Sequence, residues 1–472
     1  MTILRYIFIA LEVVLLFNLL IGVHELGHFL AAKWRGLKID RFAIWFGKPI
    51  WKKKIGGVEY ALGWIPAGGY VSLPQMATME AIEGKPEENP VQLPNVSPLD
   101  KIIVAFAGPL FSFGLAVAFA VIVWGVGKPS NEVDNSTVIG WVDPAGPAAL
   151  AGLLPGDTIL EVDGHPVQHF DAFTQDSVKW RIVTSEGTNI AIKYVRDGKE
   201  ATAYAVPFHR ATKWYERKAL RQLLVAPAAK SVVLDIVSNS PVALAGIKSG
   251  DEIIALNGKH LYSFNPILEL QNTWTNKAPE PLTLTIKRGT EQFDRTLLAV
   301  KPMLPTNSPP LLGIESLQVE TNVSLAHPSP LEQIQTSVSQ IMGTFHALFS
   351  PKSEIGVQQL GGAVMIIRVY SNLFQSDDGW RRVLWFSVVM NVNLALLNLL
   401  PLPVLDGGHI LLSLIEFIRR RPVSNQILQF IQTGFAAMLI IFMLYLAFFD
   451  TGDWVRSSRA DRDVPVVFAP AK

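Results

Sequence analysis

"GVHELGHFLAAKWRG", residues 22–36, places ionisable side chains at the end of an apolar run. The preceding residues 7–21 read "IFIALEVVLLFNLLI", and the combined stretch is long enough to span a membrane. Each ionisable group at the centre of such a span costs roughly 2.5–3.5 kcal/mol. His24, Glu25 and His28 therefore need a compensating interaction. A bound metal ion would provide one.

The spacing of these three residues predicts a zinc site. Residues four apart lie on one face of a helix, so His24 and His28 can hold one ion. Glu25 lies near the same rim, where it can take a proton from an attacking water molecule. Cysteine is absent from the chain, so the ligands must be nitrogen and oxygen atoms. The alternative is a structural cluster of polar side chains without a metal.

A catalytic zinc site needs a third protein ligand and an open fourth position. Residues 391–410, "NVNLALLNLLPLPVLDGGHI", contain the candidates. Pro401 and Pro403 break the helix, so the following turn can bring the carboxylate of Asp406 to the metal. His409 is the rival third ligand. The alternative role for Asp406 is to cap the helix that follows it.

Two asparagines in the same segment are further candidates. The amide of Asn393 or Asn398 would bind the substrate backbone or stabilise the oxyanion of the transition state. Alternatively, both residues form hydrogen bonds between helices. The sequence alone does not decide between these two roles.

The composition predicts a membrane protein with soluble modules. Hydrophobic residues make up 49% of the 472 residues, and the net charge of +1 implies no nucleic-acid partner. Four apolar segments are long enough to span the lipid bilayer. They lie near residues 6–32, 101–126, 383–402 and 427–449.

The distribution of basic residues predicts the orientation. Lysine and arginine are concentrated at residues 33–54, after the first span, and again in "EFIRRRPVS", between the third and fourth. Basic loops stay in the cytoplasm. We therefore expect residues 127–380 and both termini outside the cytoplasm, with the zinc site toward the cytoplasmic side. Arg381 and Arg382 do not fit this pattern.

An internal repeat predicts two small α+β domains. "GPAALAGLLPGDTILEVDG" at residues 146–164 aligns with "SPVALAGIKSGDEIIALNG" at residues 240–258, with nine identical positions. Each copy is typical of a short helix, a Gly-Asp turn, a strand and a hairpin turn. The repeats resemble circularly permuted PDZ domains, in which a peptide adds as a strand to a sheet edge. The alternative is a pair of packing units that bind no ligand.

Three other segments have recognisable patterns. Residues 39–73 alternate short apolar runs with glycine and proline, which predicts a small β-sheet at the cytoplasmic membrane face. Residues 331–349 predict an amphipathic helix, lying either on the outer membrane surface or against a domain. Residues 80–98 are typical of a mobile loop.

The expected fold is therefore a multi-domain membrane protein. It combines four transmembrane α-helices, a cytoplasmic-face membrane-associated β-sheet and two extracytoplasmic PDZ-like α+β domains. The predicted order is a first span with the zinc motif (1–33), the β-sheet and mobile loop (34–98), a second span (99–126), two PDZ-like domains (127–220 and 221–310), an amphipathic helix with a linker (325–380), a third span with the third ligand (381–406), a cytoplasmic loop (407–424), a fourth span (425–450) and a tail (451–472).

These motifs together resemble those of the site-2 protease family. The resemblance rests on "HELGH" in the first span, "FAGPLFSF" in the second, "LDGGH" after a Pro-x-Pro, and the two repeats. It implies an intramembrane zinc protease of a bacterial inner membrane. His24, His28 and Asp406 match the family's zinc ligands, and Glu25 matches its catalytic glutamate. Asn398, with Asn393 before it, matches an asparagine of that family.

The resemblance also implies a substrate-binding strand and a substrate class. Gly68, Gly69 and Tyr70 match a membrane-facing β-loop that holds the substrate as an extended strand. The expected partners are single-span membrane proteins whose outer domain has been trimmed, such as an anti-sigma factor, and remnant signal peptides. One departure is Ser112, at a position where relatives usually have asparagine, which weakens a polar role there.

Two other function classes fit part of the sequence. A zinc transporter would explain intramembrane histidine and aspartate, but it needs no adjacent glutamate base. A peptide-binding scaffold would explain the repeats but not the metal motif. If the chain is a protease, its PDZ-like domains either exclude large substrates or bind a new C-terminus. The sequence does not distinguish these two hypotheses.

Overall fold

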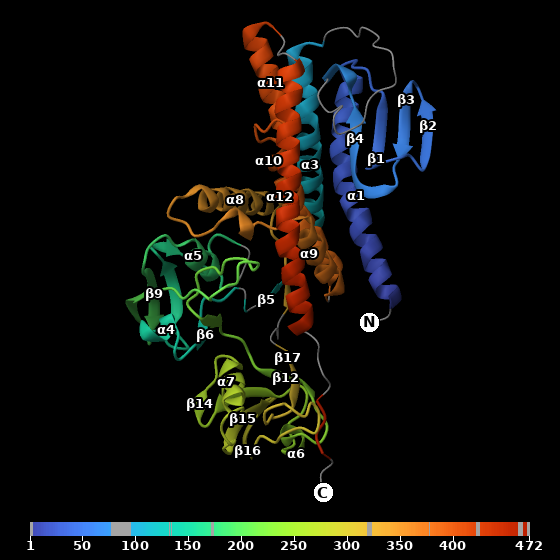
Figure 1. Cartoon of the computed structure of the whole chain (residues 1–472). Helices are drawn as coiled ribbons and strands as arrows, with labels where there is room; N and C mark the ends of the chain where they lie inside the picture. Colours follow the sequence, from blue (N-terminus) through green and yellow to red (C-terminus); the bar gives the residue numbers. More distant parts are fainter. Residues whose placement is uncertain are drawn as a thin grey trace. The chain divides into compact units, whose positions relative to one another are not determined.

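A computed structural model of the chain describes residues 3–76, 96–131, 133, 135–170, 174–318, 323–376, 378–421, 425–460 and 466–469. The chain divides into two compact units (Figure 1). The first unit comprises Met1–Lys128, Ala326–Ile341 and Leu360–Thr451. The second unit comprises Pro129–Leu325, Met342–Gln359 and Gly452–Lys472.

Long apolar helices make up most of the first unit. The central helix is α3, which packs against α1, α10 and α11. The helix α9 lies beside α10 and α1. The bounds of these helices are α1 Ile3–Trp34, α3 Pro98–Val126, α9 Ala363–Gln375, α10 Gly379–Asn398, α11 Asp406–Arg419 and α12 Asn425–Ala460.

Three helices of the described chain are long and apolar enough to cross a membrane: Ile7–Trp34, Pro98–Val126 and Leu428–Ser457. They overlap the first, second and fourth predicted spans. The predicted third span falls on α10, which does not meet the same criterion in the described residues. Arg381 and Arg382 at the start of α10 and the asparagines within it lower its mean hydropathy, which accounts for this difference. The third predicted span, and with it the total of four spans, stays a prediction.

A four-stranded sheet lies beside α1 (Figure 1). Its strands lie within the residues where the sequence predicts a small sheet. The strand order is β2-β3-β1-β4, and β4 pairs antiparallel with β1 in a register that places Gly69 opposite Ile44. Among the described strands β4 is therefore at one edge, and this edge strand packs against α1. The strands are β1 Arg41–Phe46, β2 Trp51–Ile55, β3 Val58–Leu62 and β4 Ile65–Ser72.

The second unit contains the two repeats, which fold alike. In each, a four-residue helix precedes the turn, a strand follows it, and a hairpin packs on that strand. The first repeat has β6 Ile139–Val142, α4 Pro147–Leu150, β7 Thr158–Val162, β8 His165–Pro166, α5 Val178–Thr184, β9 Ile190–Arg196, β10 Lys199–Ala205 and β11 Val225–Pro227. The second has β12 Val232–Ile236, α6 Pro241–Leu244, β13 Glu252–Leu256, β14 Lys259–His260, α7 Asn265–Thr273, β15 Leu282–Arg288, β16 Glu291–Leu297 and β17 Ile314–Gln318.

The repeated Gly-Asp turn has a structural role. Asp157 and Asp251 are each 1% exposed. Each carboxylate accepts a two-pronged hydrogen bond from one arginine, Arg196 at 2.6 Å in the first repeat and Arg288 at 2.7 Å in the second. Paired geometry of this kind compensates for burying the charge. The aspartate thus joins the turn to the hairpin in both copies.

Several predicted boundaries differ from the structure. The repeats extend beyond residues 220 and 310, because β11 pairs with β6 and β17 pairs with β12 after long connections. Residues 407–424, predicted as a loop, contain α11, whose apolar residues recur at helical spacing. The predicted linker before the third span contains α9, and α12 continues into the predicted tail. Most of the predicted mobile loop at residues 80–98 lies outside the described residues.

The remaining elements connect these parts. The predicted amphipathic helix corresponds to α8, Pro330–Phe349. A two-stranded sheet pairs β5 Lys128–Asn131 with β18 Val323–Ala326. Two short 3-10 helices span Pro74–Met76 and Val357–Gln359.

Candidate metal centre

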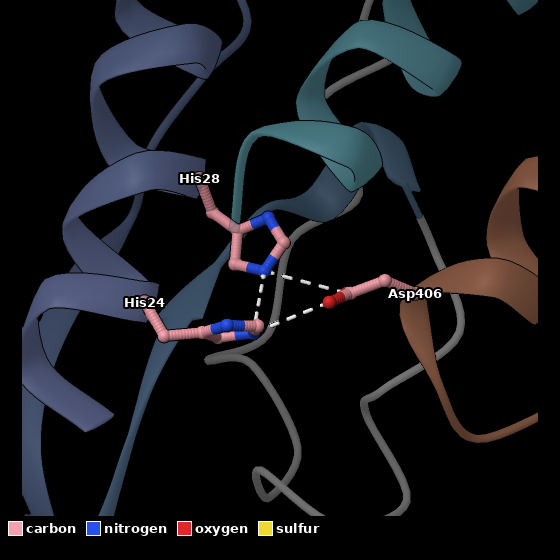
Figure 2. Close-up of side chains that lie close together, drawn as sticks. All are labelled: His24, His28 and Asp406. Carbon is pink, nitrogen blue, oxygen red and sulfur yellow. Dashed lines mark hydrogen bonds and ion pairs between the residues drawn. The ribbon is translucent and has the colours of Figure 1, made fainter. Parts of the chain in front are cut away.

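His24 and His28 lie one turn apart on α1, and their rings face a common point (Figure 2). Their Nε2 atoms are 3.2 Å apart. His24 is buried at 7% exposure, and the side chain of His28 is 12% exposed. The helix is uninterrupted through the motif because it contains no proline. Local helix geometry alone therefore brings the two imidazoles together.

Asp406 brings a carboxylate to the two rings from the first residue of α11 (Figure 2). Its Oδ2 lies 3.2 Å from His24 Nε2, and its Oδ1 lies 3.3 Å from His28 Nε2. The N-cap position of α11 belongs to Leu405, so the alternative in which Asp406 caps this helix does not match the structure.

The turn that positions Asp406 depends on two glycines. The helix α10 ends at Asn398, and the chain reverses before α11 begins. A Cβ atom at Gly407 would lie 2.2 Å from the carbonyl oxygen of Leu399, and one at Gly408 would lie 2.1 Å from that of Leu402. Both distances are shorter than any van der Waals contact, so only glycine fits this turn.

The outer nitrogen of each imidazole is held by α3. His28 Nδ1 donates a hydrogen bond to the carbonyl oxygen of Val104 at 2.8 Å, which leaves the lone pair of Nε2 toward the cluster. His24 Nδ1 lies 3.0 Å from the hydroxyl of Ser112, which is fully buried. The expectation that serine at this position weakens a polar role is therefore wrong, because Ser112 contacts a cluster histidine directly.

The three side chains fit a tetrahedral zinc ion. Zinc binds imidazole nitrogen and carboxylate oxygen at about 2.0–2.2 Å, which places two tetrahedral ligands about 3.3 Å apart. The separations between the three side chains are 3.2–3.3 Å. Asp406 Oδ2 is buried and accepts no well-aligned hydrogen bond from the described residues. A bound cation would satisfy this oxygen, since the same carboxylate faces both imidazoles.

The group of His24, His28 and Asp406 is also the one set in the described chain whose ligand atoms converge as a metal site requires. His409, the rival third ligand, does not belong to this group. It lies one turn further along α11. Of the two alternatives for the third ligand, the geometry favours the aspartate.

Gly108 on α3 closes one side of the cluster. A Cβ atom there would lie 2.2 Å from His28 Nε2 and 2.9 Å from His24 Cε1. The next glycine on this side is Gly27 on α1, where a Cβ would lie 2.4 Å from the carbonyl oxygen of Ala107. The two helices thus approach each other closely at the cluster, because both lack side chains there.

Glu25 and Gly69 place the edge strand next to the metal cluster. Glu25 is half-buried on α1, directly after His24. A Cβ atom at Gly69 would lie 3.5 Å from Glu25 Cγ and 3.8 Å from a methyl group of Ile21. The backbone of β4 therefore passes close to the glutamate.

The neighbouring residues of the predicted substrate strand point elsewhere. Gly68 has a positive φ of 83°, and a Cβ there would lie 2.1 Å from the ring of Phe46. The hydroxyl of Tyr70 accepts a hydrogen bond from Arg41 at 3.2 Å, and its ring stacks on Phe46. Both residues thus support the sheet, whereas Gly69 lies against Glu25.

The substrate-binding or oxyanion role of Asn393 and Asn398 on α10 stays a prediction. Asn393 Oδ1 is buried and has no hydrogen-bond partner among the described residues, and Asn398 is half-buried at the end of the helix. Asn391, which sequence reasoning did not select, is fully buried and donates a hydrogen bond to the carbonyl of Ser387 at 2.7 Å.

Ser112→Ala should lower the zinc affinity of the chain roughly 10- to 100-fold, since contacts to the outer nitrogen of a ligand histidine have effects of this size. Competition with a fluorescent chelator measures the affinity. Ser413→Ala is the matched control, because Ser413 is also buried but lies on α11. Equal affinities of the two variants would show that the Ser112 hydroxyl does not orient His24.

Comparisons with known proteins agree with this geometry. The chain matches peptidase family M50 over residues 12–442. A protein of Neisseria meningitidis named as a candidate zinc metalloprotease is 27% identical, covering 95% of this chain and 98% of its own length. The regulator of sigma E protease of Haemophilus influenzae is 27% identical, covering 91% and 96%. Protease RseP of Yersinia pestis is 26% identical, covering 92% and 96%.

Proposed function

The chain belongs to peptidase family M50, and from this premise we propose that it is an intramembrane zinc endopeptidase that cuts single-span membrane proteins. The observation that carries the proposal is the convergence of His24, His28 and Asp406 at one point, with both histidines on a helix long enough to cross a membrane. A metal site at that depth serves a substrate that is itself in the membrane.

In this proposal His24, His28 and Asp406 hold the zinc, while Glu25 moves the proton. Zinc held by these residues would supply Lewis-acid chemistry, which would polarise the scissile carbonyl and make water a better nucleophile. Glu25 accepts the proton of the attacking water and returns it to the nitrogen of the leaving amine. Ser112 and Val104 keep the two imidazoles in the required orientation through their Nδ1 atoms.

The edge strand β4 holds the substrate. A peptide bond in a helix is shielded by its own hydrogen bonds, so the substrate must unwind before it is cut. Pairing with the free edge of a sheet replaces the hydrogen bonds that unwinding removes. The position of Gly69 beside Glu25 would place the paired backbone next to the proton acceptor. Asn393 or Asn398 contributes an amide to the substrate backbone or the oxyanion.

The chain lies in a bacterial inner membrane with α10 as a further span. The basic residues at 33–54 and 419–421 keep those connections in the cytoplasm, which places the zinc site toward the cytoplasmic side and both termini in the periplasm. The two repeats are periplasmic PDZ-like domains, and they admit substrates whose outer domain has been trimmed. An anti-sigma factor and remnant signal peptides are the substrate classes that this reading favours.

A hydrogen bond joins the four-stranded sheet to α1 and helps to position β4 in this mechanism. Trp45 Nε1 donates to Asn18 Oδ1 at 2.5 Å, and the amide of Asn18 is oriented by its own bond to Val14 at 2.7 Å. Asn18 and Trp45 are therefore positioning residues. They keep β4 at a constant place along the helix that carries Glu25.

Trp45→Phe should raise the KM for a single-span substrate about 2- to 10-fold while kcat changes less, because one hydrogen bond contributes about 0.5–1.5 kcal/mol. Initial rates over a range of substrate concentrations in detergent separate the two constants. Trp51→Phe on β2, where the side chain is 53% exposed, is the matched control. An unchanged KM in Trp45→Phe would contradict this positioning role.

The proposed function is tested with the purified chain and a single-span substrate that lacks its outer domain. Mass spectrometry of the products should locate the cut within the membrane segment of the substrate, and removal of zinc should prevent it. A cut in the extramembrane part of the substrate, or cleavage that survives zinc removal, would contradict the proposal.

A further inference from the structure

The tail of the chain is the part of the sequence that the proposed protease chemistry does not use. Its described part, residues 466–469, docks on the second repeat within the second unit. Val467 N donates to the carbonyl oxygen of Leu304 at 2.9 Å, and Met303 N donates to that of Val467 at 2.7 Å. The tail thus forms an antiparallel bridge with the chain between β16 and β17.

A buried aromatic ring adds to these backbone contacts. Phe468 is 4% exposed, although it stands near the end of a polar and proline-containing segment. Its ring lies against Gly313, where a Cβ atom would be 3.1 Å from Phe468 Cε2. The side chain of Val467, in contrast, is 43% exposed. The tail is therefore held by its backbone and by one aromatic side chain.

The loop that contacts the tail is closed by hydrogen bonds within the second repeat. Val300 and Leu311 exchange backbone hydrogen bonds at 3.1 and 3.0 Å, so they close the loop at its base. Ala299 and Leu312, next to this base, are buried in the core of the repeat. The exposed tip of the loop, at residues 303–304, offers the backbone groups that bind Val467.

The corresponding loop of the first repeat also binds a distant segment of the chain. There Phe208 and Gln222 close the loop by exchanging backbone hydrogen bonds at 2.8 and 3.0 Å. His209 and Arg221, at the two ends of that loop, bind Glu354 at 2.5 and 3.2 Å. Both repeats therefore bind a distant segment of the chain at one topological position. The first binds it through charges, and the second binds it through backbone and an aromatic ring.

We propose that the loop of residues 300–311, together with Gly313, is a peptide-binding site of the second repeat whose resident ligand is the chain's own residues 466–469. The chemistry of the site fits an extended peptide with a β-branched residue followed by an aromatic one. Backbone pairing provides affinity, and the close packing against Gly313, which buries Phe468, selects the aromatic ring. The site does not depend on the zinc centre, so either proposal can fail without the other.

A disulfide tests the docking in the full chain. The native sequence has no cysteine, so a bridge between Leu304→Cys and Val467→Cys would be the sole disulfide. Residues that exchange backbone hydrogen bonds across an antiparallel bridge have Cα atoms about 5.5 Å apart, which suits a disulfide. We expect mild oxidation to link this pair. The control pairs Val467→Cys with Tyr204→Cys, which is 67% exposed on the first repeat. Equal cross-linking of both pairs would overturn the proposal.

Peptide binding tests the specificity. The probe is a fluorescein-labelled peptide with the sequence of residues 463–470, "DVPVVFAP". The chain without residues 466–472 should bind it saturably, and the oxidised double-cysteine chain should not, because its own tail occupies the site at a high effective concentration. Alanine at the position of Phe468 should weaken binding roughly 10- to 100-fold. Threonine at the position of Val467 should leave binding unchanged, since that side chain is half-exposed.

Two results would contradict this specificity. One is equal binding of the native and the alanine peptide to the shortened chain. The other is equal binding of the native peptide to the oxidised and the reduced double-cysteine chain. The second comparison keeps the full chain intact, so it remains informative if the shortened chain does not fold.

Discussion

We expect Glu25→Gln to cleave a single-span substrate far more slowly than the wild type, while the zinc content of the chain stays unchanged. Loss of a general base lowers the rate roughly 100- to 10,000-fold. Glutamine has nearly the shape of glutamate but does not accept the proton of the attacking water. Because Glu25 is not one of the converging metal-binding side chains, the ion should remain bound.

Cleavage rates and zinc content are measured on the same preparation. The matched control is Glu12→Gln, which makes the same change at an exposed position of the same helix. Loss of activity in Glu25→Gln together with loss of zinc would assign the glutamate to metal binding instead. Unchanged cleavage in Glu25→Gln would rule out the proton transfer that we propose.

Gly108→Ala should reduce both zinc affinity and cleavage, with cleavage falling about 100-fold, as expected when catalytic groups are displaced by about 1 Å. The added methyl group would lie 2.2 Å from His28 Nε2, so the imidazole must move away from its present position. The carbonyl of Val104 accepts a hydrogen bond from Nδ1 of the same ring. A shift of the ring therefore strains or breaks that hydrogen bond.

The helix itself offers a control for this substitution. Gly114 lies on α3 as well, and a Cβ atom there meets nothing within 4 Å. Gly114→Ala makes the same gain in helix propensity, about 1 kcal/mol, without a contact at the metal cluster. It should keep zinc and activity. If Gly108→Ala and Gly114→Ala behaved alike, the close packing of α3 against the histidines would have no functional role.

Local geometry explains why the candidate ligands on α1 could be predicted from the sequence. The spacing of His24 and His28 follows from the helical repeat, and their cost in an apolar span points to a metal. The candidate Asp406 was predicted from the prolines before it, since a broken helix frees the following residue to turn. That it reaches the histidines depends on packing of α11 against α3, which spacing does not encode.

The residues of α3 that contact the two histidine rings could not be predicted, because the contact depends on how α3 packs against α1. Ser112, Val104 and Gly108 meet the rings only when α3 packs on α1 in one register. The small residues of "AFAGPLFSF" were the available signal for a close approach. The predicted loop at residues 407–424 overlooks α11, because Asp406 and the two glycines after it are typical of a turn. The apolar residues that follow recur at helical spacing, and the alternative cap role of Asp406 already implies a helix there.

The most direct test of the central claim is the zinc content of three purified chains: wild type, Asp406→Asn and His409→Asn. We predict about one zinc ion per chain in the wild type and in His409→Asn, and loss of zinc and of substrate cleavage in Asp406→Asn. Zinc retained by Asp406→Asn but lost from His409→Asn would contradict the proposed ligand set, and with it the account of how this chain would cut a peptide bond.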